Sequence, residues 1–220
     1  MEGKYLKGSK VFLITGVLLG WFALLAQLYL IIVNNAAPVI EAVVRYFSFF
    51  TILTNIIAAL CLSKLLLNAN KDDHSFLTRP DTLAAVTVYI SVVGIVYNLI
   101  LRFTWQPQGL QFFVDELLHA VLPILFISYW LLFVPKNTLK WSASLLWLIY
   151  PFFYLLFILL RGSCSGFYPY PFVDVNKLGY NKVLLNSFYL LIVFLMLSLL
   201  LIGSGKLIQN HRKKNKYLRY

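Results

Sequence analysis

The sequence predicts an all-α fold, a polytopic membrane protein built as a bundle of six transmembrane helices. Of its 220 residues, 60% are hydrophobic and only 12% are charged. A soluble domain carries about 25% charged residues. The mean hydropathy of +0.79 agrees with a membrane protein, and the length predicts one membrane domain over residues 1–220.

Six apolar runs each approach the ~20 residues that a helix needs to cross the hydrocarbon core. We place these helices at residues 11–33, 42–67, 81–101, 112–133, 142–160 and 180–205, followed by a basic tail over 206–220. Turn-forming segments separate them: NNAAP, NANKDDH, WQPQG, VPKN and, longest, RGSCSGFYPYPFVDVNK. The first run is too long for the core of a signal peptide, so we expect an anchor. Aromatic residues at run ends, such as Trp105 and Trp141, are typical of the membrane interface.

The distribution of lysine and arginine predicts the orientation. One side of the membrane receives five of these residues, namely Arg45, Arg102, Arg161, Lys177 and Lys182. The other side receives fourteen, namely Lys4, Lys7, Lys10, Lys64, Lys71, Arg79, Lys136, Lys140, Lys206, Arg212, Lys213, Lys214, Lys216 and Arg219. By the positive-inside rule, both termini are expected to be cytoplasmic. The basic tail is then typical of contact with anionic membrane lipids, and we expect no binding of nucleic acid.

Cysteine and histidine give no sign of a metal or cofactor. Cys61 falls deep in the helix at 42–67 and Cys164 in an outer loop, so no disulfide between them is expected. No metal-binding spacing occurs. His119 is the only histidine inside a span, since His74 and His211 lie in a loop and the tail, so paired-histidine haem ligation is not expected.

A polar stripe opens the second helix. In RYFSFFTILTN, Arg45, Ser48, Thr51 and Asn55 follow one another at steps of three, three and four. This spacing places all four on one face of a continuous helix over 42–67. Asn55, the deepest, is expected to form a hydrogen bond between helices.

Further polar residues gather at the same depth. They are Asn98 and Arg102 in the third helix, Asp115, Glu116 and His119 in the fourth, Arg161 at the end of the fifth, and Tyr168, Tyr170 and Asp174 in the loop after it. With the predicted topology, all lie in the outer third, roughly 10 Å below the boundary for Ser48 and His119. Ionisable groups in a span usually face a bundle interior or a water-filled cavity. The pattern therefore predicts a polar pocket that opens toward the outer side.

Each residue also has a purely structural interpretation. A membrane Ser or Thr usually bonds its own i−4 carbonyl or a neighbouring helix. Arg45 and Arg102 are long enough to reach the interface, and Asp115 and Glu116 suit the positive N-terminal end of a helix. Taken singly, none of these residues predicts catalysis.

Together, the residues favour hydrolysis by a hydroxyl nucleophile. Ser48, or Thr51 one turn along, attacks only if a base removes its proton, and His119 is the one base within the membrane that titrates near neutral pH. The Asp115 carboxylate, four residues before His119, is expected to orient its imidazole, with Glu116 as the second candidate. Arg45 or Arg102 is expected to bind a substrate carboxylate or an oxyanion. The remaining substrate-binding candidates are Asn98, Glu116, Arg161 and Tyr170.

Three segments resemble a known family, the androgen-induced and androgen-dependent six-helix membrane proteins with their bacterial relatives. They are RYFSFFTILTN at the opening of the second helix, ELLHAVLP at the opening of the fourth, and RGSCSGFYPYPFVDV after the fifth. The resemblance implies a hydrolase of fatty acid esters of hydroxy fatty acids that uses a threonine and a histidine. When the aromatic residues of RYFSFFTILTN are aligned with those of the family, Ser48 falls at the position of the nucleophile. The family nucleophile is a threonine, however, and by residue type it corresponds to Thr51, one turn along. The histidine also stands one residue closer to its proline than in the animal members.

The leading interpretation is thus a multi-pass hydrolase of lipid-like esters in a bacterial inner membrane, without a cofactor. Its partners are a lipid or fatty-acid-ester substrate and the membrane lipids. The alternative is a non-enzymatic carrier or binder of a lipid or small molecule, because no glycine-rich oxyanion loop is present. A transporter is disfavoured. Transporters usually place charges near the midplane and interrupt their helices with Gly or Pro, whereas here the charges lie in the outer third and the predicted spans are continuous.

Overall fold

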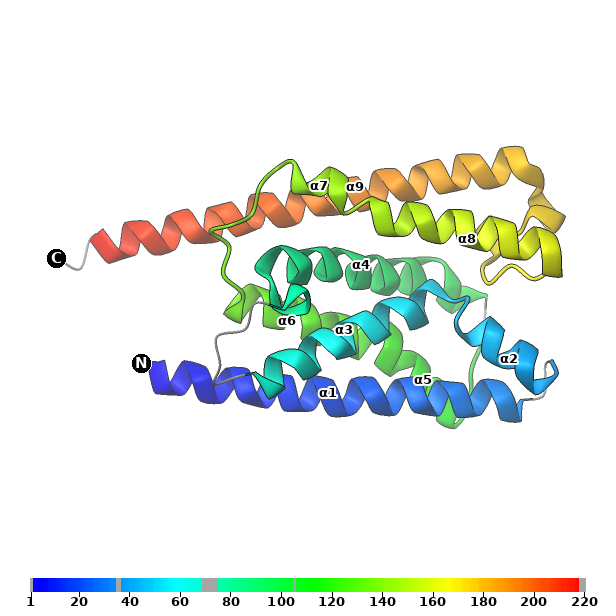
Figure 1. Cartoon of the computed structure of the whole chain (residues 1–220), viewed down its shortest axis with the longest axis horizontal. Helices are drawn as coiled ribbons and strands as arrows, with labels where there is room; N and C mark the ends of the chain where they lie inside the picture. The colour runs from blue at the N-terminus through cyan, green and yellow to red at the C-terminus, as the bar shows by residue number, and fades with distance from the viewer. Residues whose placement is uncertain (1, 35–36, 69–74, 105, 218–220) are drawn as a thin grey trace. The chain divides into compact units, whose positions relative to one another are not determined.

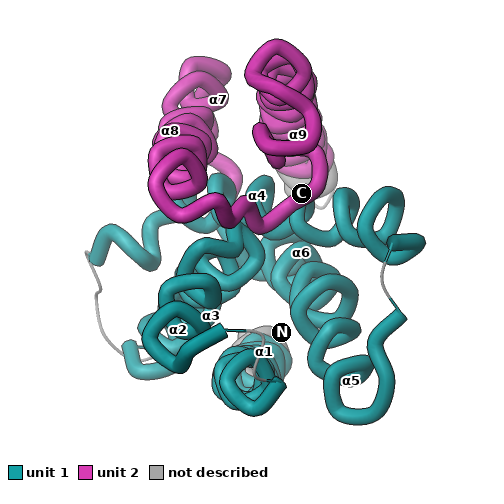
Figure 2. Tube along the Cα trace, turned by 90° about the vertical axis from the view of Figure 1, so that its right-hand side faces the viewer, with its two compact units in different colours: residues 1–135 teal, residues 136–220 magenta. Residues whose placement is uncertain are grey.

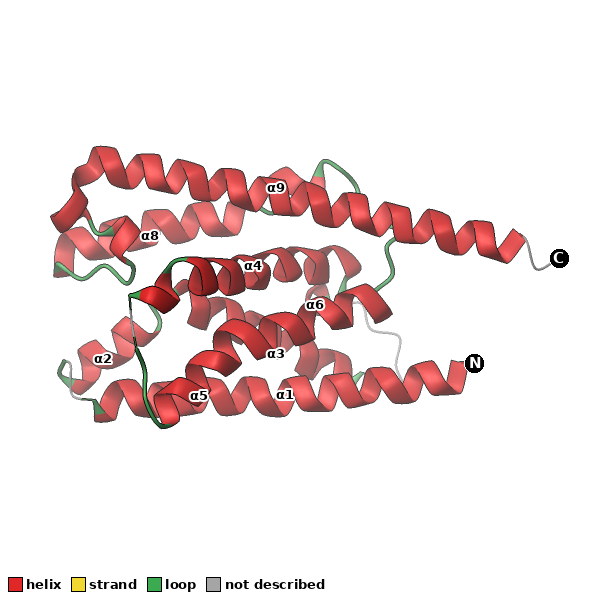
Figure 3. Cartoon of the chain, turned by 180° about the vertical axis from the view of Figure 1, so that it is seen from behind, coloured by secondary structure: helices red, strands yellow, loops and turns green. Residues whose placement is uncertain are grey.

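The computed structural model describes residues 2–34, 37–68, 75–104 and 106–217, and the side chains of these residues from 8 to 211. The described residues form helices and loops, and no strand occurs among them (Figure 3). Within the described part of the chain, six helices are long and apolar enough to cross a membrane: Gly8–Val33, Phe50–Leu67, Pro80–Phe103, Leu110–Phe133, Ala143–Ser165 and Val175–His211. The predicted fold class, an all-α polytopic membrane protein, is confirmed.

Some residues used to predict the topology lie outside the described part. Lys71, His74, Trp105 and Arg219 are among the positions that the structure leaves undescribed, and the side chains of Lys4, Lys7, Arg212, Lys213, Lys214 and Lys216 are likewise outside it. The orientation of the termini therefore stays a prediction.

The chain divides into two compact units, Met1–Pro135 and Lys136–Tyr220 (Figure 2). The expectation of a single membrane domain stays a prediction.

Unit 1 contains four of the six spans. Its helices, shown in Figure 1, are α1 (Glu2–Val33), α2 (Val39–Tyr46), α3 (Phe50–Leu67), α4 (Pro80–Leu99), α5 (Leu110–Glu116) and α6 (Leu122–Phe133). A π-helical turn, η3 (Leu117–Val121), joins α5 to α6, and two short 3-10 turns are η1 (Phe76–Thr78) and η2 (Leu101–Phe103). The predicted helix at 112–133 is thus one span whose hydrogen-bond register changes in the middle.

The long helices of unit 1 close into a four-helix bundle. α1 packs on α3, α3 on α4, α4 on α6, and α6 back on α1. On α1, Gly16 and Gly20 form a GxxxG pair. Gly20 faces Ala59 of α3, which would lie 3.4 Å from a Cβ added at Gly20. Small residues at this spacing let two backbones approach closely, which is how membrane helices gain packing energy when lipid is as apolar as the protein interior.

Unit 2 is a helical hairpin with the remaining two spans. It comprises α7 (Ala143–Leu146), α8 (Ile149–Ser165), the 3-10 turn η4 (Pro171–Val173) and α9 (Val175–Tyr217). Ile158, Val173 and Val183 form its buried core. Pro151 has no N–H for the carbonyl of Trp147, which explains why α7 and α8 are separate helices within the predicted run at 142–160. Gly179 (φ 72°, ψ 160°) interrupts α9, close to the predicted helix start at residue 180.

Candidate functional site

The π-helical turn that carries His119 has a cause in the sequence. The N–H of Leu122 bonds the carbonyl of Leu117, five residues back. The carbonyl of Leu118 therefore loses its usual i+4 donor. The carbonyl of His119 loses its own because residue 123 is proline, which has no N–H. Two backbone acceptors are thus left without regular helix partners inside an apolar span.

Two asparagine side chains bond these carbonyls. Asn55 of α3 donates through Nδ2 to the Leu118 carbonyl (3.3 Å), and Asn98 of α4 donates to the His119 carbonyl (3.1 Å). Each amide also bonds the carbonyl four residues back on its own helix, Thr51 (2.9 Å) and Gly94 (2.8 Å) respectively. The expected interhelical role of Asn55 is therefore present. Asn98, proposed from the sequence as substrate-binding, uses its amide to hold the turn.

The imidazole of His119 is fixed on one side. Its Nδ1 lies 2.9 Å from the backbone carbonyl of Asp115. Because a carbonyl only accepts, Nδ1 must donate, so the neutral ring carries its proton there and leaves Nε2 with a lone pair. The ring stacks on Tyr97 of α4, with centroids 3.8 Å apart and planes 12° apart. A π turn is often found at functional sites, and this one presents the single histidine that sequence reasoning selected.

The structure corrects the role expected for the Asp115 carboxylate. The hydrogen bond that sets the histidine tautomer is donated by His119 Nδ1 to the Asp115 backbone carbonyl. The buried carboxylate itself accepts from Gln111 Nε2 at 3.0 Å and, at a longer 3.4 Å, from the Tyr97 hydroxyl. Gln111 also donates to Gln27 Oε1 of α1 at 2.8 Å. A side-chain network inside the bundle thus joins α1, α4 and α5.

Arg102 and Glu116 form an ion pair at the edge of this network. Arg102 lies in η2, and its Nη2 donates to Glu116 Oε1 at 2.5 Å. The guanidinium also lies 5.5 Å from the centroid of the Tyr97 ring, a distance at which a cation is attracted to an aromatic face. Sequence reasoning assigned both residues to substrate binding, and the structure pairs them with each other. A substrate carboxylate that binds Arg102 would have to replace Glu116.

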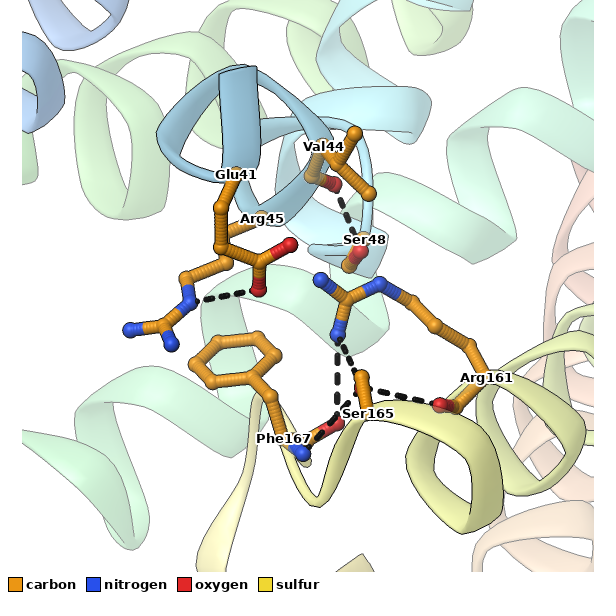
Figure 4. A network of polar contacts seen from close by, with 7 residues as sticks. All are labelled: Glu41, Val44, Arg45, Ser48, Arg161, Ser165 and Phe167. Carbon is orange, nitrogen blue, oxygen red and sulfur yellow. Dashed lines mark hydrogen bonds and ion pairs between the residues drawn. The ribbon is translucent and has the colours of Figure 1, made fainter. Parts of the chain in front are cut away.

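The expected continuous helix over 42–67 is wrong. α2 ends at Tyr46 and α3 begins at Phe50, so the chain bends between them (Figure 1). The N–H of Ser48 bonds the Arg45 carbonyl three residues back (2.9 Å), while its hydroxyl donates to the Val44 carbonyl (2.7 Å; Figure 4). A serine hydroxyl that bonds a nearby carbonyl competes with the helix ladder in this way, and Phe49 then adopts extended backbone (φ −80°, ψ 126°).

The bend separates the four residues of the polar stripe. Arg45 lies on α2, where its Nε donates to Glu41 at 2.8 Å (Figure 4), and Ser48 lies in the bend. Only Thr51 and Asn55 share a face of α3. The hydroxyl of Ser48, the expected nucleophile, donates to the Val44 carbonyl of its own segment. Thr51 lies one turn before Asn55, whose amide contacts the residue next to His119.

Arg161 and Tyr170 belong to unit 2. Nη1 of Arg161 donates to Ser165 Oγ (3.2 Å) and to the Phe167 carbonyl (3.3 Å), and the guanidinium lies 4.9 Å from the Phe167 ring (Figure 4). Tyr170 stacks on Phe172 with centroids 5.2 Å apart. Both residues therefore order the segment between α8 and α9, and their predicted role in substrate binding stays a prediction.

Sequence reasoning did not select Tyr97, Gln27 or Gln111. A signal existed for two of them, because Tyr97 directly precedes Asn98 and Gln27 is a lone amide within the apolar run at 11–33.

Sequence reasoning also did not note the GxxxG pair, Gly16 and Gly20. This pair lines a small cavity of about 10 Å³ together with Asn55, Ala58 and Ala59. Oδ1 of Asn55 is buried without a hydrogen-bond partner in the described part of the chain.

The described residues around His119 include no cluster of metal-binding side chains. Among the described residues, no three His, Cys, Asp or Glu side chains lie close enough together to hold a metal ion. Cys61 is buried and Cys164 exposed, and both are free thiols. Comparisons of the chain with known protein families, with curated proteins and with solved structures found no match.

Proposed function

We propose that this protein is an integral membrane hydrolase of lipid-like esters, in which Nε2 of His119 is the general base. The observation that carries the proposal is the Nδ1 bond of His119 to the Asp115 carbonyl, because it holds the neutral ring in the tautomer that a base requires. The sequence resemblance to hydrolases of fatty acid esters supports the same reaction class, and a location in a bacterial inner membrane belongs to the same proposal.

Thr51 is the preferred nucleophile. It lies on α3 one turn, or roughly 6 Å along the axis, before Asn55, and Asn55 bonds the residue adjacent to His119. Ser48 lies before the start of α3, in the bend between α2 and α3, and so does not share the helix that carries Asn55. Threonine is also the residue that the resemblance implies. These observations support Thr51, the candidate chosen by residue type, over Ser48, the candidate chosen by alignment of the aromatic residues.

The reaction would proceed in two steps. The Thr51 hydroxyl oxygen attacks the ester carbonyl carbon as its proton passes to His119 Nε2, and collapse of the tetrahedral intermediate expels the alkoxide, which takes that proton. Water then attacks the acyl-enzyme with His119 again as base, which releases the fatty acid and restores the threonine. Arg102 would bind a carboxylate of the substrate, which would take the place of the Glu116 carboxylate in the ion pair.

Labelling by a fluorophosphonate tests the proposal in detergent-solubilised protein. We expect the wild-type chain and Thr51→Ser to be labelled, and Thr51→Ala and His119→Ala to lose labelling. Ser48→Ala should keep it. Ser198→Ala is the matched control for the serine variant, because the buried Ser198 hydroxyl makes the same i−4 bond, to Phe194 at 2.7 Å, in unit 2. Labelling that survives in His119→Ala would show that His119 is not the base.

A second candidate function is a non-enzymatic binder or carrier of a lipid or small molecule. The observation in its favour is that the polar groups around His119 bond one another, as in the Arg102–Glu116 pair. This function predicts that the wild-type chain is not labelled by the fluorophosphonate. It also predicts that a fluorescent fatty acid binds the wild-type protein and binds Arg102→Met more weakly.

A further inference from the structure

We propose that Asn98 is a positioning residue for His119, which acts by replacing the backbone hydrogen bond that Pro123 removes. The carbonyl of His119 has no N–H four residues on, and the Asn98 amide donates to it at 3.1 Å. The inference deepens the proposed function and rests on it only for the claim that His119 reacts. The position and tautomer of the ring are measurable without any reaction.

Helix α4 holds His119 at two points. Asn98 bonds its backbone carbonyl, and the neighbouring Tyr97 stacks on its ring at 3.8 Å. Since consecutive residues of one helix make both contacts, any movement of η3 along α4 disturbs the two together. The stacking on Tyr97 of α4 and the Nδ1 bond to the Asp115 carbonyl of α5 together set the direction of Nε2.

Gly94 makes the close approach of α4 to η3 feasible. A Cβ at this position would lie 3.2 Å from the His119 carbonyl oxygen and 3.3 Å from Pro123 Cβ. The Asn98 amide is tied to the Gly94 carbonyl as well (2.8 Å). The Asn98 amide therefore bonds one carbonyl on its own helix and one on η3, and the two bonds together restrict the movement of the side chain.

Asn55 supports the same turn from the other side. It donates to the Leu118 carbonyl, whose usual donor, the Leu122 N–H, bonds Leu117 instead. A bare carbonyl within a span has no water to bond. The same holds for the His119 carbonyl, which would be left without a donor if Asn98 were replaced. We therefore expect η3 to change its hydrogen-bond register in such a variant, and the His119 ring to turn away from both the Asp115 carbonyl and Tyr97.

The first experiment reads the histidine tautomer by ¹⁵N NMR of the full chain labelled at histidine in detergent micelles. His119 is assigned by comparison with His119→Gln. We expect one neutral tautomer in the wild type, with the proton on Nδ1, and a mixture of tautomers in Asn98→Leu. Asn186→Leu is the matched control, because the Asn186 amide likewise donates to a backbone carbonyl, that of Phe172 at 3.0 Å, within unit 2. This control should keep the wild-type spectrum.

The second experiment separates positioning from a general loss of structure. Pro123→Ala restores an N–H that can donate to the His119 carbonyl. We expect Asn98→Leu to lower the rate of fluorophosphonate labelling by about 10- to 100-fold, the scale of a small misplacement of a reacting group. In the Pro123→Ala background the same substitution should have a clearly smaller effect on both the tautomer and the rate. Asn98→Ala, which removes the donor without adding bulk, replaces Asn98→Leu if that variant does not fold.

Two results would overturn the inference. One is a His119 spectrum of Asn98→Leu identical to that of the wild type, and the other is an equal effect of Asn98→Leu with and without Pro123. If the wild-type chain is not labelled at all, the proposed hydrolase is wrong, and the NMR arm in both backgrounds still decides whether Asn98 positions the ring.

Discussion

The GxxxG pair of α1 allows a prediction in which two neighbouring glycines respond differently to the same substitution. A Cβ added at Gly16 would lie 2.7 Å from Leu62 Cδ1 and 2.9 Å from Leu125 Cδ2. These distances are too short for two carbon atoms, so the leucine side chains must move. A Cβ at Gly20 would lie 3.4 Å from Ala59 Cβ, which is an ordinary contact.

The magnitudes follow from two opposing terms. Replacing glycine by alanine within a helix stabilises it by about 1 kcal/mol. At Gly16, overpacking costs about 1–3 kcal/mol, so the net change in the free energy of unfolding is a loss of about 0–2 kcal/mol. At Gly20, only the gain applies. For a chain of this size, 1 kcal/mol corresponds to roughly 2–4 °C in Tm.

The assay is thermal unfolding of the purified protein in one detergent. Gly20→Ala should raise Tm by about 2–4 °C and Gly16→Ala should leave it unchanged or lower it by up to about 8 °C. Gly8→Ala is the control, because the nearest atom to a Cβ there, Phe133 Cζ, is 3.9 Å away, and it should behave like Gly20→Ala. An equal rise in Tm for Gly16→Ala and Gly20→Ala would refute the close packing of α1 on α3 at Gly16.

Two further predictions concern pH and topology. Burial raises the pKa of Tyr46, which donates its hydroxyl to the Leu24 carbonyl at 2.9 Å, to about 12. Because the unfolded value is about 10, the contribution of Tyr46 to stability is complete below pH 10 and is lost between pH 10 and 12. The stability difference between wild type and Tyr46→Phe, measured by urea unfolding at pH 8 and pH 11, should therefore be smaller at pH 11; a constant difference would contradict this. Cys164 is exposed and lies on the predicted outer side, so a membrane-impermeant maleimide should label it on intact cells and fail with Cys164→Ser, whereas labelling only after permeabilisation would reverse the predicted orientation.

The hydrogen bonds around His119 show what local pattern left undecided. The sequence singled out His119, Asp115 and Asn98 from the cost of placing polar groups in lipid. It could not tell which atoms would pair, because a carboxylate and a backbone carbonyl of the same Asp115 are both within reach of a histidine four residues later. Pro123 was visible in the sequence, but its consequence, an unpaired carbonyl at His119, required a second helix close enough to supply the Asn98 amide.

The helix break at Ser48 is the clearest case of a local pattern that misled. Steps of three, three and four from Arg45 to Asn55 are correct for a helix, and the segment is apolar enough to continue one. The Ser48 hydroxyl instead bonds the Val44 carbonyl, and α3 begins only at Phe50. A serine hydroxyl can replace a backbone N–H as the donor to one carbonyl, and hydrophobic periodicity does not report which donor is used.

By itself the sequence determined the six membrane spans, because the cost of exposing polar groups to hydrocarbon acts on every residue wherever its neighbours lie. The tertiary structure decided the partners: the pairing of Arg102 with Glu116, the stacking of Tyr97 on His119, and the two asparagine amides that support the π turn. These contacts join residues from different helices, and their geometry depends on how closely glycines such as Gly94 and Gly20 let the helices approach.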